Sequence, residues 1–79
     1  MFLDMHTHED WARVSGAIAG KVREKLLGRL RDFELHHVEG AFELRGSCAT
    51  YHVKQLAQEE VIGLSQVPIR RNRISVIAA

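Results

Sequence analysis

The fold of this chain is decided by the stretch Gly40-Ala41-Phe42-Glu43-Leu44-Arg45-Gly46. Apolar and polar side chains alternate along it, which places Phe42 and Leu44 together on one face of a predicted strand. The same period of two runs through Phe33 and Leu35, just before a Glu-Gly pair at positions 39 and 40. Glycine adopts the positive φ of a tight turn at no steric cost. We therefore predict two short strands joined as a β-hairpin.

A helical pattern precedes the hairpin. Apolar residues recur every four positions, at Val14, Ile18, Val22, Leu26 and Leu30. This spacing predicts an amphipathic helix whose apolar stripe covers the sheet. Two starting points fit the pattern, because Thr7 with Asp10 resembles a capping box and Ser15 beside Gly16 resembles an N-cap. The helix is expected to give way to the first strand, which begins at Phe33.

A second helix and a third strand follow the hairpin. Thr50 stands before a largely apolar stripe, which predicts a helix from about Tyr51 to Ser65. Pro68 cannot continue a helix, and β-branched residues near the end of 70–77 indicate a strand. The expected order is α-β-β-α-β, an α+β fold. Right-handed crossover then places both helices on one face of a three-stranded mixed sheet.

The hairpin resembles the signature of the BON domain family, in which a Gly-x-apolar-x-Leu-x-Gly hairpin precedes a helix and a final strand. The positions that match the family pattern in one register are Phe33, Leu35, Gly40, Phe42, Leu44, Gly46, Ala57, Val67, Asn72, Ile74 and Val76. Two positions depart from it, since Gln66 replaces the Gly of a Gly-Val pair and Arg70 replaces a core-facing Val. We expect an altered turn there, with Arg70 snorkelling from the sheet edge.

The resemblance implies a non-catalytic module, often periplasmic or membrane-associated, for which interaction with phospholipid or another ligand has been proposed. The composition of the 79 residues, 46% apolar and 27% charged, predicts one globular domain over 1–79, with a flexible segment at 1–10. The N-terminal residues show no secretion signal, and no apolar run is long enough to span a bilayer. Cys48 is the only cysteine, which excludes an intramolecular disulfide. We therefore expect a cytoplasmic variant of the family.

The face of the sheet opposite the helices is the predicted binding surface. Alternation places on it Glu34, His36, Glu43, Arg45, Arg71, Arg73 and Ser75. Arginine is suited to phosphate recognition, so Arg45, Arg71 and Arg73 are predicted to contact an anionic ligand or a lipid headgroup. Two alternatives stay open. The charges could form cross-strand pairs on a solvated face, or a protein partner or second copy could cover it.

Basic positions on the first helix are a further candidate for lipid contact. Lys21, Lys25 and Arg29 lie four residues apart, beside the apolar stripe. That stripe is needed to cover the sheet, so we expect a solvated flank instead. Nucleic-acid binding is disfavoured by a net charge of only +1 and by the lack of aromatic residues interleaved with the arginines.

Five histidines raise the question of a metal site. Adjacent His36 and His37 point to opposite faces of a strand and cannot chelate one ion together. His6 and His8 stand near the N-terminus, where a transition metal would bind weakly. Because no set of four ligands is visible, we predict neither a metal nor a cofactor.

Catalytic motifs are also missing from the sequence. Cys48 and His52 stand near the start of the second helix, but Cys48 occupies a small apolar position and is expected to be a buried structural residue. The sequence contains no phosphate loop, HExxH or GxSxG motif, which predicts that the protein is not an enzyme. Gly40 and Gly46 are explained by a tight turn and by a strand end, without a ligand.

Overall fold

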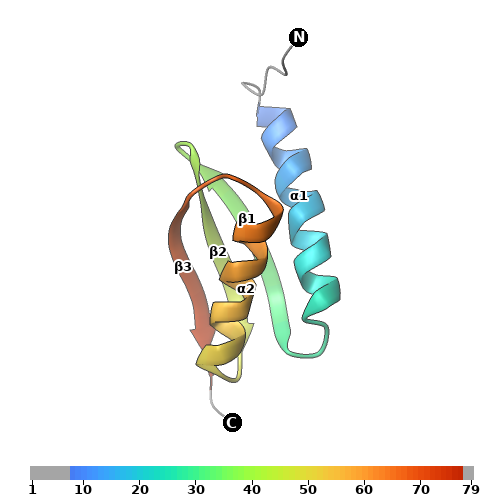
Figure 1. Ribbon diagram of the computed structural model, residues 1–79, viewed down its shortest axis with the longest axis vertical. Coiled ribbons are helices and arrows are strands. Elements are labelled where there is room, and N and C mark those ends of the chain that lie inside the picture. Colours follow the sequence, from blue (N-terminus) through green and yellow to red (C-terminus); the bar gives the residue numbers. More distant parts are fainter. Residues whose placement is uncertain (1–7, 78–79) are drawn as a thin grey trace.

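The computed structural model describes residues 8–77 and has two helices and three strands. The elements are α1 (His8–Lys25), β1 (Leu30–Val38), β2 (Ala41–Cys48), α2 (Tyr51–Leu64) and β3 (Ile69–Val76). The sheet has the order β1-β2-β3, in which β1 and β2 are antiparallel and β2 and β3 are parallel. Both helices lie on one side of the sheet, with α1 beside β1 and α2 over β2 and β3 (Figure 1). The predicted α+β fold is confirmed.

The ends of α1 differ from the expected ones. Ser15 is not an N-cap, because the helix already begins at His8 and buries Ser15 in its middle. Thr7 lies outside the described residues. At the other end Gly28 adopts a φ of 84°, and the Leu30 amide donates to the Leu26 carbonyl. Such a left-handed residue ends a helix, so Leu30 continues the apolar spacing from within β1.

The hairpin turn is formed by Glu39 and Gly40, as predicted. Both have a positive φ, 51° for Glu39 and 82° for Gly40. Val38 and Ala41 face each other across the turn, so its loop has two residues. Two successive positive φ values are typical of the type I′ turn, whose twist matches that of the strands.

A bulge in β1 brings the backbones of β1 and β2 close together at Gly46. The register shifts between Arg31 and Glu34, where Asp32 has a φ of 53°. Gly46 lies opposite with a φ of 149°, and a Cβ there would be 2.9 Å from the Arg31 carbonyl oxygen. Gly46 is therefore required inside β2, so its assignment to a strand end was wrong.

The core lies between the sheet and the helices. Its largest fully buried side chains are Phe33, Phe42, Leu44, Ile74, Val22 and Val61. Leu35 and Ala57 are also buried, while Val67 and Val76 pack against this cluster from the side. The apolar positions of the hairpin pattern are thus the core positions of the fold.

Polar contacts fix α2 against the third strand. The Thr50 hydroxyl accepts a hydrogen bond from the Val53 amide at 3.2 Å and caps α2, which begins at Tyr51 as predicted. Asn72 in β3 faces α2, and its side-chain amide donates to the Lys54 carbonyl and to Gln58 Oε1, both at 3.1 Å. Asn72 Oδ1 accepts from the amide of Ile74. One polar side chain among apolar neighbours thus joins the helix to the strand.

Replacing Gly46 by alanine is expected to lower the free energy of unfolding by about 2–4 kcal/mol, because the new methyl group meets backbone atoms in a conformation that L-residues rarely adopt. Urea unfolding measures the loss. Gly20→Ala is the control, since a Cβ there meets nothing within 4 Å and alanine favours a helix by about 1 kcal/mol. Equal stability of the Gly46→Ala variant and the wild type would contradict the bulge.

Candidate functional site

The face of the sheet away from the helices carries all the residues predicted for the binding surface. We call it the open face. The strand register arranges it in three rows: His36, Glu43 and Arg71; Glu34, Arg45 and Arg73; Arg31, Ser47 and Ser75. Arg45, Arg71 and Arg73 are exposed, whereas Glu43 is only 8% exposed. Tertiary structure thus brings the three predicted arginines together and buries the carboxylate beside them.

A bulge at the start of β3 places a fourth arginine, Arg70, on the open face with Arg45, Arg71 and Arg73. Phe42 pairs with Ile69 and Glu43 pairs with Arg71, which leaves Arg70 as the extra residue. Arg70 and Arg71 therefore share one face, although they are neighbours in the sequence. Arg70 was expected at an altered junction, but it was not among the predicted contacts. The signal for it was the break in alternation at Arg70-Arg71.

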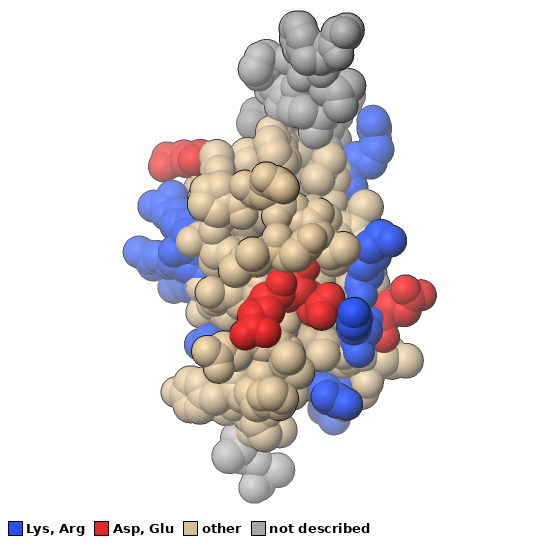
Figure 2. All heavy atoms as spheres, in the orientation of Figure 1, with Lys and Arg blue, Asp and Glu red and all other residues tan. Residues whose placement is uncertain are grey.

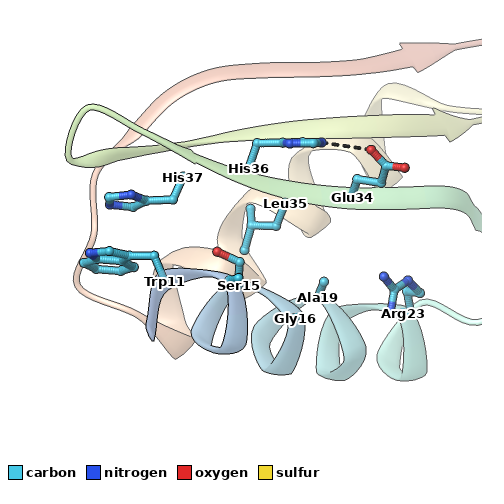
Figure 3. A pocket seen from close by; sticks show the side chains of 10 residues that line it. Trp11, Ser15, Gly16, Ala19, Arg23, Glu34, Leu35, His36 and His37 are labelled. Atoms are coloured by element: carbon cyan, nitrogen blue, oxygen red, sulfur yellow. Dashed lines mark hydrogen bonds and ion pairs between the residues drawn. The ribbon is translucent and has the colours of Figure 1, made fainter. Parts of the chain in front are cut away.

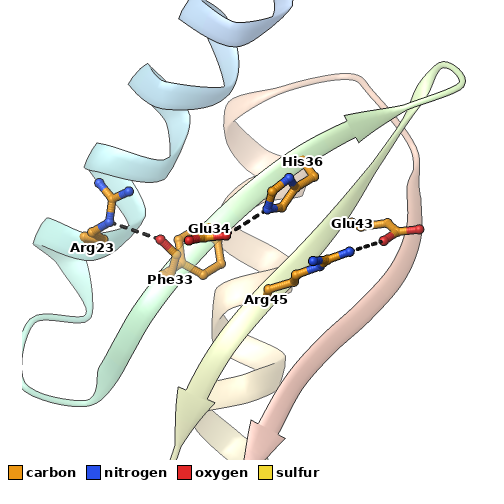
Figure 4. Close-up of polar contacts among 6 residues, drawn as sticks. All are labelled: Arg23, Phe33, Glu34, His36, Glu43 and Arg45. Atoms are coloured by element: carbon orange, nitrogen blue, oxygen red, sulfur yellow. Dashed lines mark hydrogen bonds and ion pairs between the residues drawn. The ribbon is translucent and has the colours of Figure 1, made fainter.

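Glu43 is the acidic centre of the open face. Arg45 Nη2 lies 3.6 Å from Glu43 Oε1, a contact that is drawn in Figure 4, and Arg70 Nε lies 4.0 Å from Glu43 Oε2. Arg70 also reaches Glu39 in the hairpin turn, at 3.3 Å. Cross-strand pairing, one of the two alternatives left open by the sequence, therefore occurs around Arg70.

Glu34 does not complete such a pairing with Arg45. The two residues are opposite each other in the register, yet Glu34 Oε1 contacts Nε2 of His36 at 2.8 Å on its own strand. Figure 4 shows this contact along β1. Arg45 therefore has Glu43 as its carboxylate partner, and that carboxylate is shared with Arg70.

Two arginines of β3, Arg71 and Arg73, stand apart from the ion pairs of the open face. Within the part of the chain that the structure describes, Arg71 and Arg73 have no hydrogen bond or ion pair from their side chains. Arg73 stands directly opposite Arg45, and like charges in that position destabilise a sheet. Figure 2, which views the molecule from the helix side, shows basic side chains at the edge where β3 lies and also along α1. Among the described residues, the open face thus carries two unpaired arginines in addition to the paired Arg45 and Arg70.

The first helix uses its apolar stripe for the core, as expected. Ile18 and Val22 are buried against the sheet, and Lys25 Nζ lies 3.6 Å from Glu60 Oε2 of α2. Lys21 and Arg29 are exposed at its flank and beyond its end. The apolar surface that a membrane-bound helix would need is thus already covered.

The histidines of β1 point to opposite sides of the sheet, as predicted. His36 lies on the open face, while His37 stacks on Trp11 of α1 with ring centroids 3.8 Å apart. Among the described residues no three potential ligands gather around one point. The side chains of His6 and His8 lie outside the part that the structure describes.

Cys48 is buried, as its sequence position predicted. It is 5% exposed, and its thiol donates a hydrogen bond to the Thr50 carbonyl at 3.2 Å. His52 is exposed on the first turn of α2. The thiol therefore contributes to the packing between the end of β2 and the start of α2.

Replacing Glu43 by glutamine removes the carboxylate that Arg45 and Arg70 share. We expect a loss of about 1 kcal/mol in the free energy of unfolding at low salt, because the arginines of the open face then repel one another. The loss shrinks at high salt, where the repulsion is screened. Urea titrations at two salt concentrations measure it. The control is Glu59→Gln on the exposed side of α2, and an equal loss in both variants would refute the central role of Glu43.

Comparisons of the chain with models of protein families, with curated proteins and with solved structures found no match. The resemblance of the hairpin to the BON family therefore stays a prediction. Among the described residues no helix combines the length and the apolar character needed to cross a membrane.

Proposed function

We propose that this protein is a non-catalytic, BON-like binding module whose open face contacts phosphate groups of phospholipids at an anionic membrane surface. Arg45, Arg71 and Arg73 are the proposed contact residues. The observation that carries the proposal is that, within residues 8–77, the side chains of Arg71 and Arg73 have no partner, while a third arginine, Arg45, directly opposes Arg73.

The spacing of these guanidinium groups suits a phosphate. Arg45 and Arg73 are on neighbouring strands, about 4.8 Å apart at the backbone, and Arg71 is two residues from Arg73 on the same strand. A guanidinium donates two parallel hydrogen bonds to a phosphate, which is why arginine predominates in such sites. A bound phosphate would also relieve the repulsion between Arg45 and Arg73. Phosphate binding between Arg45 and Arg73 would therefore also stabilise the sheet.

Self-association through the open face is the alternative. The face carries five arginines, Arg31, Arg45, Arg70, Arg71 and Arg73, and only two glutamates, Glu34 and Glu43. Two copies placed face to face would bring like charges together, which is costly at an interface. An anionic partner therefore suits the face better than a second copy.

Co-sedimentation with vesicles tests the proposal. The protein is expected to bind vesicles that contain phosphatidylserine at low salt, and to bind pure phosphatidylcholine vesicles much more weakly. The double variant Arg71→Ala with Arg73→Ala should bind about 30-fold more weakly, since each arginine near an anionic surface contributes about 1 kcal/mol. Lys21→Ala with Lys25→Ala removes the same charge from the exposed side of α1 and should change binding little.

Three outcomes would overturn this function. The first is no binding at low salt, and the second is an equal loss in both double variants, which would indicate attraction by overall charge. The third is a dimeric mass in light scattering that becomes monomeric in the variant lacking Arg71 and Arg73. A titration with inorganic phosphate separates recognition of free phosphate from recognition of a lipid surface.

A further inference from the structure

The helix layer of this protein is wider than its sheet. Two helices packed side by side span about 20 Å, whereas three strands span about 15 Å. Helix α2 packs on β2 and β3, so α1 is left to pack on β1 and extends beyond its outer edge. Figure 1 shows α1 at the side of β1 rather than beneath the middle of the sheet. The part of α1 that extends beyond the edge of β1 is therefore about as wide as one additional strand.

A groove of about 520 Å³ lies in this space, between α1 and the outer edge of β1. Small residues of α1, namely Ala12, Gly16 and Ala19, form its floor. Trp11 stacked on His37 closes one end, and Arg23 stands at the other (Figure 3). The groove thus follows β1 along the part of the strand between its bulge and the hairpin turn.

The backbone of β1 has hydrogen-bonding groups that point away from β2, on the outer edge beside the groove. The Phe42 amide donates to the Pro68 carbonyl, on the side away from β1. His37 pairs with Phe42 in the register, so this pair is not hydrogen-bonded and His37 directs its own N–H and C=O outward. Leu35, two residues away, does the same. The next outward carbonyl, that of Phe33, accepts from Arg23 Nε at 3.2 Å.

Two side-chain atoms at the groove are also without partners. Ser15 is 7% exposed, and its Oγ has no hydrogen bond within the described residues. The same is true of Nε2 of His37. In Figure 3 the Ser15 hydroxyl points from α1 toward the sheet, between Trp11 and Leu35. Buried polar atoms are normally satisfied, so these two atoms are available to a polar group that enters the groove.

We propose that this groove binds an extended polypeptide segment, which adds to the outer edge of β1 as a fourth strand. The outward groups of Leu35 and His37 would pair with the backbone of the segment, as in other cases of strand addition. A small polar side chain of the segment would face Ser15 and His37. A carboxylate of the segment would lie at the Arg23 end of the groove. There it would accept hydrogen bonds from the terminal N–H groups of the guanidinium, because only Nε donates to Phe33.

A second copy of this chain is a poorer occupant. Pairing two β1 edges would place two α1 helices next to each other, and each already extends beyond the edge of its own sheet. The helix layer of such a dimer would span about 40 Å below six strands that span only about 29 Å. A segment without a helix of its own avoids this conflict. The segment needs only about five residues to follow β1 from Phe33 to His37.

Trp11 provides a direct readout, because it is the only tryptophan and its ring lies at the groove. The probes are a library of short acetylated peptides with alternating Val and randomised positions, in one set with a free carboxyl terminus and in the other with an amide. Binders are expected to change Trp11 fluorescence. Methylating every second backbone nitrogen of a binder should abolish binding, whereas methylating the intervening nitrogens should be tolerated.

Two glycines of α1 provide matched variants. Neither Gly16 nor Gly20 would bring a Cβ within 4 Å of another residue, but only Gly16 lines the groove. Gly16→Leu should fill the groove and weaken peptide binding at least about tenfold, while Gly20→Leu should leave it unchanged. Ser15→Ala should weaken binding while raising the urea midpoint of the free protein, since it removes an unpartnered hydroxyl.

The proposal is overturned if no peptide of either set binds or if the two leucine variants bind peptide equally. It is also overturned if methylation of the two alternating sets of backbone nitrogens has the same effect. A doubled mass in light scattering that Gly16→Leu abolishes would assign the groove to a second copy and would also overturn it. Arg71→Ala with Arg73→Ala should leave peptide binding intact. Peptide binding therefore tests the groove independently of the vesicle binding that tests the open face.

Discussion

The close approach of β1 and β2 at Gly46 is the constraint on which the rest of the structure depends. Leu30 and Phe33 are three residues apart, and a regular strand would direct them to opposite faces. Both are buried on the helical side because the bulge around Asp32 inserts one residue between them. The bulge needs a partner without a Cβ, and Gly46 is that partner. It thereby sets the register of the hairpin.

A second bulge has the same effect on β3 and determines the character of the open face. Ile69 and Asn72 are also three residues apart, and both face the helices because Arg70 is the extra residue between them. Four arginines of β2 and β3 consequently share one face around a single buried carboxylate, that of Glu43. The positive charge of the face is thus a product of packing on the other side of the sheet, where Asn72 joins β3 to α2.

The groove beside β1 has a different origin, in the mismatch between two helices and three strands. The extra width leaves α1 beyond the sheet and leaves the outer edge of β1 without a neighbouring strand. Such edges are usually blocked by charge, short strands or a covering element. Here small residues of α1, with Ser15 among them, leave room beside the edge. The protein therefore has two distinct candidate surfaces, the arginine-bearing open face and the groove beside β1.

The sequence by itself determined the element order, the turn at Glu39 and Gly40, and the apolar face of each strand, because these depend on local periodicity and on the conformational freedom of glycine. It also placed Arg45, Arg71 and Arg73 on one face, since alternation relates them directly. Only the tertiary structure decided the two bulges, the burial of Glu43 and the pairing of Arg70, because each depends on the residue that faces it from a neighbouring strand. Likewise, the groove exists only where α1 meets the edge of β1. No local sequence pattern indicates how far the helix layer extends beyond the sheet.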